Sequence, residues 1–169
     1  MKKLNTIHTK RVFLLILSLF VMTFFYSCKK SAEKASEKMI EKSIGDDATV
    51  DIDDEKITIE TDEGKFTTDA KAKEWPKEIP NDVPKFTKGN VTAVTTQEMD
   101  KSNNWVIIFG DVPENALDDY QTKLKGEGFT IVFNTAAGMG GHMAAEKDNY
   151  NIVIMAAEGD ATVTVGVKK

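Results

Sequence analysis

A single cysteine, Cys28, is the sequence feature that most limits how this chain can fold. With one thiol, no disulfide can form within the chain, so an exported protein of this kind must be stabilised by its apolar core alone. The sequence has 169 residues, which allows one domain or two small ones. A lone thiol that cannot serve the fold in this way needs an explanation of its own.

The segment that precedes Cys28 has the features of a secretory signal. An apolar run covers residues 12–26, and the basic residues before it are Lys2, Lys3, Lys10 and Arg11. The run is shorter than the roughly 20 residues that a membrane-spanning helix needs. Its length is typical of the apolar region of a signal peptide. We therefore predict a cleaved signal peptide over residues 1–27.

The end of the apolar run, Ser27-Cys28, resembles the lipobox of bacterial lipoproteins, in which a small residue precedes the cysteine that receives the lipid. Phe25 and Tyr26 depart from the leucine and the small residue that are commoner at those positions. The resemblance implies that Cys28 is the lipid-attachment residue. It also implies a location in the cell envelope, anchored by lipid and facing the periplasm or the cell exterior. The alternatives are an ordinary signal peptide with an incidental cysteine, or an uncleaved anchor.

Cleavage would change the charge of the protein. The whole chain carries a net charge of −5, and residues 1–27 hold four cationic side chains and no acids, so the mature chain carries −9. An acidic surface repels phosphate backbones, so we expect no nucleic-acid partner. The expected partner is a membrane, through lipid on Cys28. Lys29 and Lys30 either add roughly 1 kcal/mol each at anionic headgroups or are simply solvated.

Residues 28–45 are predicted to be a lipid-anchored helical tether. A Glu-Lys tetrapeptide occurs three times there, beginning at Glu33, Glu37 and Glu41. The repeat gives favourable pairs of opposite charge three residues apart, beside a narrow apolar seam. We interpret the helix as a stalk or as a helix lying on its own domain. A partner-binding amphipathic helix is the alternative.

Period-two patterning follows over residues 46–68. Apolar residues alternate with polar ones on two short segments, at Val50, Ile52, Ile57 and Ile59. This alternation predicts a small β-meander with one apolar face. A lone hairpin is marginal in water, so the meander must rest on the remainder of the protein or on the first helix.

Residues 69–88 are predicted to be a proline-rich linker. Three of the four prolines of the chain lie there, four residues apart. Proline fixes φ and lacks an N–H donor, which excludes a helix and a central strand and favours an extended strap. The apolar residues Trp75, Ile79 and Val83 recur with the same spacing and are placed to attach the strap to a surface.

Residues 89–169 predict one compact domain. The strongly apolar segment 105–109 is expected to be a central strand, and Leu117, Tyr120 and Leu124 give the next helix a single apolar stripe. This helix is expected to begin at residues 111–113. The resulting order, β-β-α-β-β-β-β, predicts an α+β fold: a mostly antiparallel sheet with one helix packed on a face, preceded by a short helix and the small β-meander. We expect the segment from about residue 84 onward to fold by itself.

A second resemblance rests on the proline strap and on the predicted helix. The helix has the form Tyr-x-x-x-Leu-x-x-x-Gly-aromatic, from Tyr120 to Phe129. In this order the two features resemble a small secreted domain found in many bacterial lipoproteins, some of which also carry an acidic meander. The resemblance spans most of residues 45–167, and its motifs are structural. Such domains are mostly of unknown function, so the resemblance implies a fold and a location in the cell envelope but no activity.

The mature chain offers little catalytic or metal chemistry. Its only histidine, His142, follows the Gly-rich segment 134–141, which lacks the third glycine and the helix of a dinucleotide fingerprint and is predicted to be a hairpin loop. One histidine and one lipidated cysteine cannot supply a zinc site. A cluster of acids lacks the glycine of an EF-hand loop, which leaves calcium binding open: Asp46, Asp47, Asp51, Asp53 and Asp54. We expect no cofactor, no metal and no catalytic residue.

These observations favour a protein that is not an enzyme. The expected function is that of a membrane-anchored bacterial envelope lipoprotein, a binding or envelope-assembly module for an unknown envelope protein, glycan or lipid. The alternative is a small envelope hydrolase that uses His142 with a carboxylate as its acid–base pair. A histidine inside a concave pocket would favour the hydrolase, and a solid core of sheet and helix without such a pocket would favour the binding module.

Overall fold

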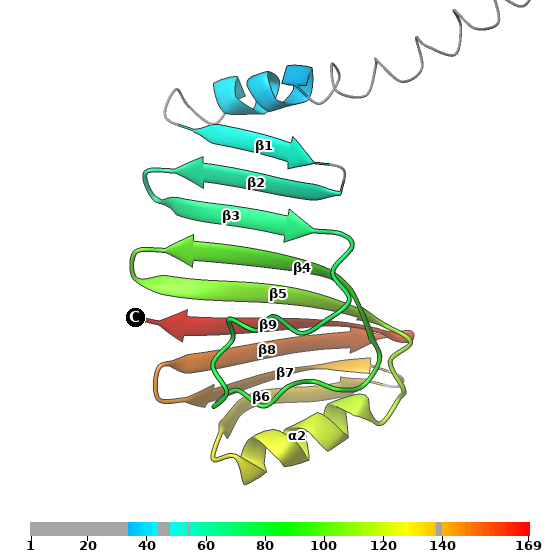
Figure 1. Cartoon of the computed structure of the whole chain (residues 1–169). Helices are drawn as coiled ribbons and strands as arrows, with labels where there is room; N and C mark the ends of the chain where they lie inside the picture. The colour runs from blue at the N-terminus through cyan, green and yellow to red at the C-terminus, as the bar shows by residue number, and fades with distance from the viewer. Residues whose placement is uncertain (1–33, 44–47, 54, 138–139) are drawn as a thin grey trace, which may run out of the picture.

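The computed structural model describes residues 34–43, 48–53, 55–137 and 140–169 (Figure 1). Residues 34–43 form a short helix. The strands that follow are β1 (Thr49–Asp53), β2 (Lys56–Thr61), β3 (Gly64–Asp69), β4 (Asn90–Met99), β5 (Ser102–Gly110), β6 (Thr130–Ala137), β7 (Gly140–Lys147), β8 (Tyr150–Ala157) and β9 (Asp160–Lys168), with helix α2 (Ala116–Gly126) between β5 and β6.

The described strands form one antiparallel sheet in the order β1-β2-β3-β4-β5-β9-β8-β7-β6 (Figure 1). This confirms the α+β class with a mostly antiparallel sheet. Strands that are neighbours in the sheet are consecutive in the chain, except that β5 lies beside β9. This pair joins segments that are distant in sequence, with Ile107 opposite Val163. The apolar segment 105–109 lies in β5, the middle strand of the sheet, so its central position is also confirmed.

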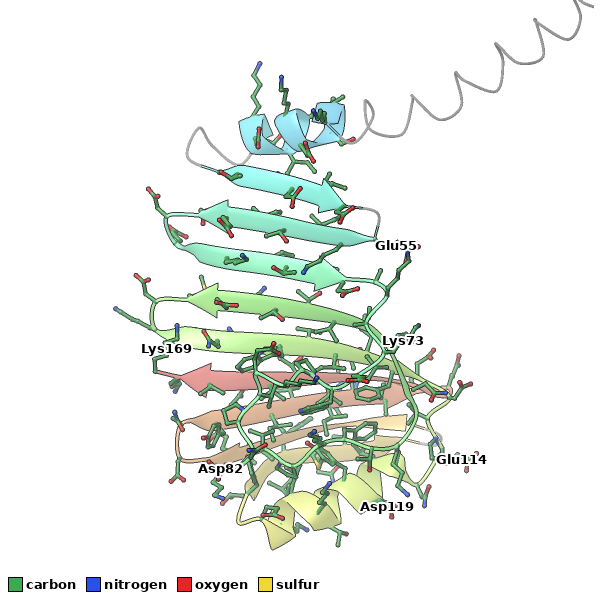
Figure 2. All side chains as sticks on the ribbon, viewed as in Figure 1. Glu55, Lys73, Asp82, Glu114, Asp119 and Lys169 are labelled. Atoms are coloured by element: carbon green, nitrogen blue, oxygen red, sulfur yellow. The ribbon has the colours of Figure 1, made fainter. Side chains whose placement is uncertain are left out.

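One face of β4–β9 is covered by α2 and by the connection between β3 and β4, which we call the strap (residues 70–89) (Figure 1). Figure 2 shows side chains gathered in the layer between these segments and the sheet. Phe109 of β5 lies in this layer, with its ring centroid 4.9 Å from that of Phe86 and 6.5 Å from that of Trp75. Burial of aromatic rings and of β-branched strand residues is therefore what holds the layers together.

The strap belongs to the core rather than only to a surface. Ile79, Val83 and Phe86 are each less than 5% exposed, and Trp75 packs against the core while partly exposed. The predicted attachment of the strap by its apolar residues is thus confirmed. A unit that began at residue 84 would lack Ile79 and Val83, so the expected boundary removes two core side chains.

Helix α2 packs into the core through its apolar stripe and is hydrogen-bonded to the strap. Leu117, Tyr120 and Leu124 are buried, as the spacing predicts. The Tyr120 hydroxyl donates a hydrogen bond to the carbonyl oxygen of Pro84 at 2.5 Å. Burial raises the pKa of this phenol, so the hydroxyl stays protonated and remains a donor.

The helix starts later than expected, at Ala116 rather than at residues 111–113. Val112 is buried and its N–H donates to the carbonyl oxygen of Gly159 at 2.7 Å, which holds this segment against the β8–β9 turn. At the other end, Gly128 has φ +86°, and the N–H of Phe129 donates to Leu124. Glycine adopts this left-handed conformation without steric cost, so Gly128 lets the chain leave the helix and turn into β6.

The meander β1–β3 continues the same sheet. β3 pairs with β4 in unbroken register from Gly64 opposite Met99 to Asp69 opposite Val94. The hydroxyls of Thr68 and Thr95 lie 3.1 Å apart across this junction. Backbone pairing with β4 is therefore the support that the meander was expected to need. The division of the chain into separate domains stays a prediction.

The Gly-rich segment 134–141 was predicted to be a loop, and this is wrong for most of its length. β6 runs to Ala137 and β7 begins at Gly140, and these two residues are paired. A Cβ atom at Gly140 would collide with the carbonyl oxygen of Ala156, so the glycine permits close strand approach. Glycine and alanine are weak strand formers, which is why the local sequence did not reveal that the strands extend through this segment.

Two neighbouring isoleucines of β5 test this placement of the core. Ile107 is fully buried on the covered face, whereas Ile108 is 43% exposed on the other face. We expect Ile107→Asp to destabilise the mature chain by more than about 4 kcal/mol, because it buries a carboxylate without a partner. We expect Ile108→Asp to cost about 1 kcal/mol, as for a strand-propensity change. Urea unfolding followed by tryptophan fluorescence measures both, and equal losses would show that the faces are misassigned.

Candidate functional surfaces

The predicted lipid-attachment residue, Cys28, lies outside the described residues, as do Lys29 and Lys30. The signal peptide and the anchor therefore stay predictions. Within the part of the chain that the structure describes, no helix has the length and hydropathy that crossing a membrane requires. The first described segment, the helix over residues 34–43, begins six residues after Cys28.

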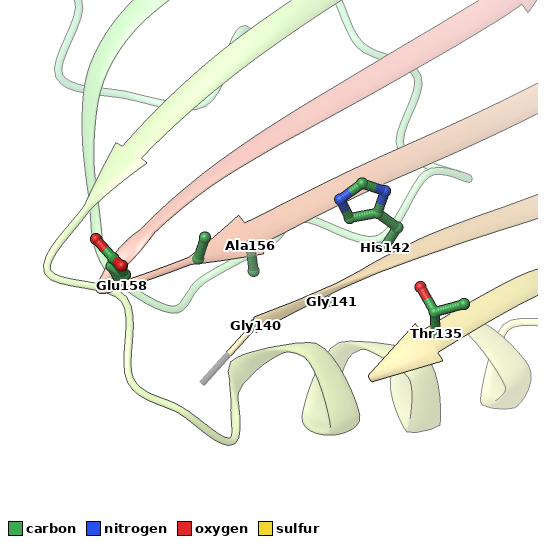
Figure 3. Close-up of a pocket in the computed structure, with 7 residues that line it drawn as sticks. Thr135, Gly140, Gly141, His142, Ala156 and Glu158 are labelled. Carbon is green, nitrogen blue, oxygen red and sulfur yellow. The ribbon is translucent and has the colours of Figure 1, made fainter. Parts of the chain in front are cut away.

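His142 lies on β7, exposed, on the face of the sheet that α2 and the strap do not cover. With Thr135 and Glu158 it lines an open hollow of about 460 Å³ whose floor is glycine and alanine. Figure 3 shows the imidazole at one end of the hollow and Glu158 near the turn after β8, with Ala156 between them. Among the described residues no carboxylate hydrogen-bonds to His142, so the base and the group that would orient it are not brought together.

The acidic residues of the meander are only partly described. Asp51 and Asp53 lie on the same side of β1 and are exposed, as the alternation predicts, whereas Asp46, Asp47 and Asp54 lie outside the described residues. In the described ranges, no three His, Cys, Asp or Glu side chains are grouped as a metal ion would require.

The two faces of the sheet differ sharply in charge. The face that α2 and the strap cover on β4–β9 is charged where it continues onto β1–β3, with Asp51, Asp53, Lys56, Glu60, Lys65 and Asp69. Lys65 and Glu60 pair across this face at 2.6 Å. The hydrogen bond and the charge of Glu60 raise the pKa of Lys65. Charged pairs at this exposed surface keep it solvated.

The opposite face, which we call the open face, is almost free of charge across the described strands. Strand alternation and register place apolar residues on it in every strand but β9: Val50, Ile52, Ile57, Ile59, Phe66, Ala93, Val106, Ile108, Phe133, Ala144, Val153 and Met155. Its ionisable strand residues are His142, Glu146, Asp160 and Lys168. Charged residues make up 29% of the whole chain, so their scarcity here marks a surface suited to contact with another molecule.

The register aligns the open face into rows across β4, β5, β9, β8, β7 and β6. One row is apolar and threonine-rich, and it consists of Thr95, Val106, Thr164, Val153, Ala144 and Phe133. The neighbouring row is polar, and it consists of Gln97, Asn104, Gly166, Asn151 and Glu146. An apolar row beside a row of amides offers both area to bury and groups that hydrogen-bond.

Gly166 lies between two asparagines in the polar row. A Cβ atom on Gly166 would lie 3.0 Å from Oδ1 of Asn104 and 3.0 Å from Oδ1 of Asn151. The two amides therefore converge over the glycine from the strands on either side. Convergent amides over bare backbone are the arrangement that positions a hydrogen-bonding ligand group.

The β1 edge of the sheet is covered by the helix over residues 34–43 (Figure 1). The N–H of Val50 donates to Oε1 of Glu41 and the N–H of Ile52 donates to Oε1 of Glu37, both at 3.1 Å. Four helical residues rise about 6 Å and two strand residues about 6.7 Å, so glutamates four apart match N–H groups two apart. The sequence showed the Glu-Lys repeat but not this role, because the role depends on the strand beside it.

Comparisons of the chain with protein-family models, with curated proteins and with solved structures gave no match. The candidate surfaces are therefore judged on their own chemistry. Of the residues singled out from the sequence, the structure places His142 on the open face and Asp51 on the charged one. The amide row and the edge-capping glutamates were missed, since both arise from pairing between segments.

The edge cap predicts a local effect of removing the two glutamates. In Glu37→Ala/Glu41→Ala we expect the amide protons of Val50 and Ile52 to exchange with solvent at least about tenfold faster, because each loses a hydrogen bond to a charged acceptor. The matched control is Lys38→Ala/Lys42→Ala, which removes the exposed lysines of the same helix. Hydrogen exchange followed by mass spectrometry or NMR measures both. Equal exchange in the two variants would argue against the cap.

Proposed function

We propose that the protein is a bacterial envelope lipoprotein, held to a membrane by lipid on Cys28, whose sheet serves as a non-enzymatic binding or envelope-assembly module. The anchor is supported by the short apolar run that ends at the lone cysteine of the chain. The order β-β-α-β-β-β-β from β4 onward, preceded by the proline strap, supports the resemblance to secreted lipoprotein domains.

The place where the chain enters the fold supports an oriented attachment. Five residues lie between Cys28 and the helix over residues 34–43, so in extended form this connection spans about 20 Å at most. That helix caps β1, so lipid on Cys28 would hold the β1 end of the sheet near the bilayer. Eight strand spacings of about 4.8 Å then carry β6 roughly 38 Å from β1. The open face would be held clear of the membrane surface along most of this distance.

The near absence of charge on the open face is the observation that carries the binding role. This face joins an apolar row to a row of convergent amides, whereas an enzyme needs titratable groups gathered in one concave site. The hollow at His142 holds no paired acid and base in the described chain, so the alternative, a hydrolase that uses His142, has less support than the binding role. The ligand class that suits this surface is an uncharged segment of an envelope protein, with a glycan or a lipid as the other possibilities that the test separates.

The anchor is tested by the substitution Cys28→Ala in the full chain, expressed in a bacterium fed a labelled fatty acid. We expect the wild type and the matched control Ser31→Ala to carry the label and to sediment with membranes, and Cys28→Ala to carry no label, because the thiol is the acylated group. A wild-type chain without label, together with a variant that still sediments, would refute the anchor.

The binding role is tested by placing a charge on each face in turn. We expect Val153→Lys, in the apolar row of the open face, to abolish recovery of specific envelope proteins in a pull-down with the tagged full chain. Thr58→Lys, on the charged face of β2, is the matched control and should leave recovery unchanged. Parallel incubation with purified peptidoglycan and with lipid vesicles assigns the ligand class. Recovery that survives Val153→Lys and is lost in Thr58→Lys would place the binding surface on the other face.

A further inference from the structure

We propose that β6, the outer strand of the sheet, pairs with β6 of a second copy of this chain and so forms a two-fold symmetric dimer. The two edges of the sheet differ in how their backbones are covered. β1 is capped by glutamate side chains from the first helix. Within the described ranges, no side chain hydrogen-bonds to the backbone of β6, which is last in the strand order.

The composition of β6 is unusual for an edge strand. Its eight residues, Thr-Ile-Val-Phe-Asn-Thr-Ala-Ala, include no charge and no proline, although edge strands commonly carry these residues to prevent pairing with other chains. Val132 and Phe133 are 54% and 52% exposed. An uncharged edge with exposed apolar side chains is the kind of strand that accepts another strand by backbone hydrogen bonding.

The register of β6 defines which part of it is suited to pairing. A bulge at Val132 interrupts the ladder with β7 between Ile131 and Phe133. Beyond the bulge, residues 133–137 stay in unbroken antiparallel register with β7. An unbroken segment of five residues is as long as many whole strands, so we place the symmetry axis within residues 133–137.

Charge favours a second copy as the occupant of this edge. The mature chain carries −9, so two copies repel each other over most of their surfaces. At β6 the two copies would meet without like charges facing each other, because this strand has no charged residue. A two-fold axis also makes each group face its symmetry counterpart, and an uncharged strand tolerates this where β1, with Asp51 and Asp53, would not.

Helix α2 adds complementary charges on the same side. α2 packs on β6 and β7, and its strap-facing flank is identified by the ion pair of Asp119 with Lys88 at 2.8 Å. Helical periodicity puts Asp118 and Lys125 on the opposite flank, toward the β6 edge, and both are exposed. When the strands pair antiparallel, the two α2 helices are also antiparallel, so Asp118 of each copy faces Lys125 of the other.

The spacing of the two helices suits this arrangement. With strands about 4.8 Å apart, a helix seated over β6 and β7 lies roughly 5 Å from the symmetry axis. The two α2 axes are then roughly 10 Å apart, which is within the usual range for packed helices. The dimer is thus stabilised by backbone hydrogen bonds at β6 and by two reciprocal ion pairs above it.

Cysteine cross-linking in the full chain tests the strand contact. The one natural cysteine is Cys28, so wild type sets the background. Single cysteines are introduced at residues 132 to 136 and, as a control, in Ile108→Cys on the open face, and cells are treated with an oxidant. We expect the disulfide-linked dimer to peak at one position of β6 and to fall on both sides, because only the residue on the axis faces itself. No peak along β6, or an equal yield at residue 108, would overturn the proposal.

Charge substitution tests the same contact by a second route. We expect Phe133→Lys and Phe133→Glu each to weaken the dimer of detergent-extracted full chain at least tenfold, and co-expression of the two to restore it, since opposite charges then face across the axis. Asp118→Lys should weaken the dimer, and Asp118→Lys/Lys125→Asp should recover it. Ile108→Lys is the matched control on the open face. Circular dichroism melts verify folding, and a wild type that is monomeric at every concentration, or a dimer lost only in Ile108→Lys, would contradict pairing at β6.

Discussion

Burial of the covered face of β4–β9 beneath the strap and α2 is the interaction on which the rest of this structure depends. Phe109 at the middle of the sheet contacts Phe86 and Trp75 of the strap, and Tyr120 of α2 closes the layer by its hydrogen bond to Pro84. Without an internal disulfide, this apolar layer is the source of stability for the C-terminal part of the chain. It also decides which face of the sheet is left open.

The meander β1–β3 depends on that layer indirectly. Its apolar side chains lie on the open face, away from the strap, and its other face is charged. No described segment forms a second layer over it, so it is held by backbone pairing of β3 with β4 and by the glutamates that cap β1. Hydrogen bonding therefore extends the sheet where apolar burial could not, and the cap prevents further strands from adding at that end.

The proposed binding role rests on the difference between the two faces of the sheet. Titratable groups are spread over one face of the meander and over the surface of α2, while the open face collects apolar side chains and amides. Such a distribution suits recognition of another molecule over a broad area better than chemistry at one point. The edge at β6 lies at the far end of the sheet from the capped edge at β1, so the proposed anchor and the proposed self-contact occupy separate ends of the fold.

The sequence by itself determined the local periodicities. The apolar strand at residues 105–109 and the stripe of Leu117, Tyr120 and Leu124 were both predicted, because each depends on residues a few positions apart. The same holds for the burial of Ile79 and Val83, whose spacing follows from the prolines beside them.

Only the tertiary structure decided how these pieces meet. The pairing of β5 with β9, the strand character of the Gly-rich segment 134–141, the late start of α2 at Ala116 and the capping role of Glu37 and Glu41 were not predictable. Each is set by a contact with a segment distant in sequence, such as the carbonyl oxygen of Ala156 facing Gly140. Local pattern determines which face of an element is apolar, but the partner that covers that face is chosen by the burial and hydrogen bonding of the whole chain at once.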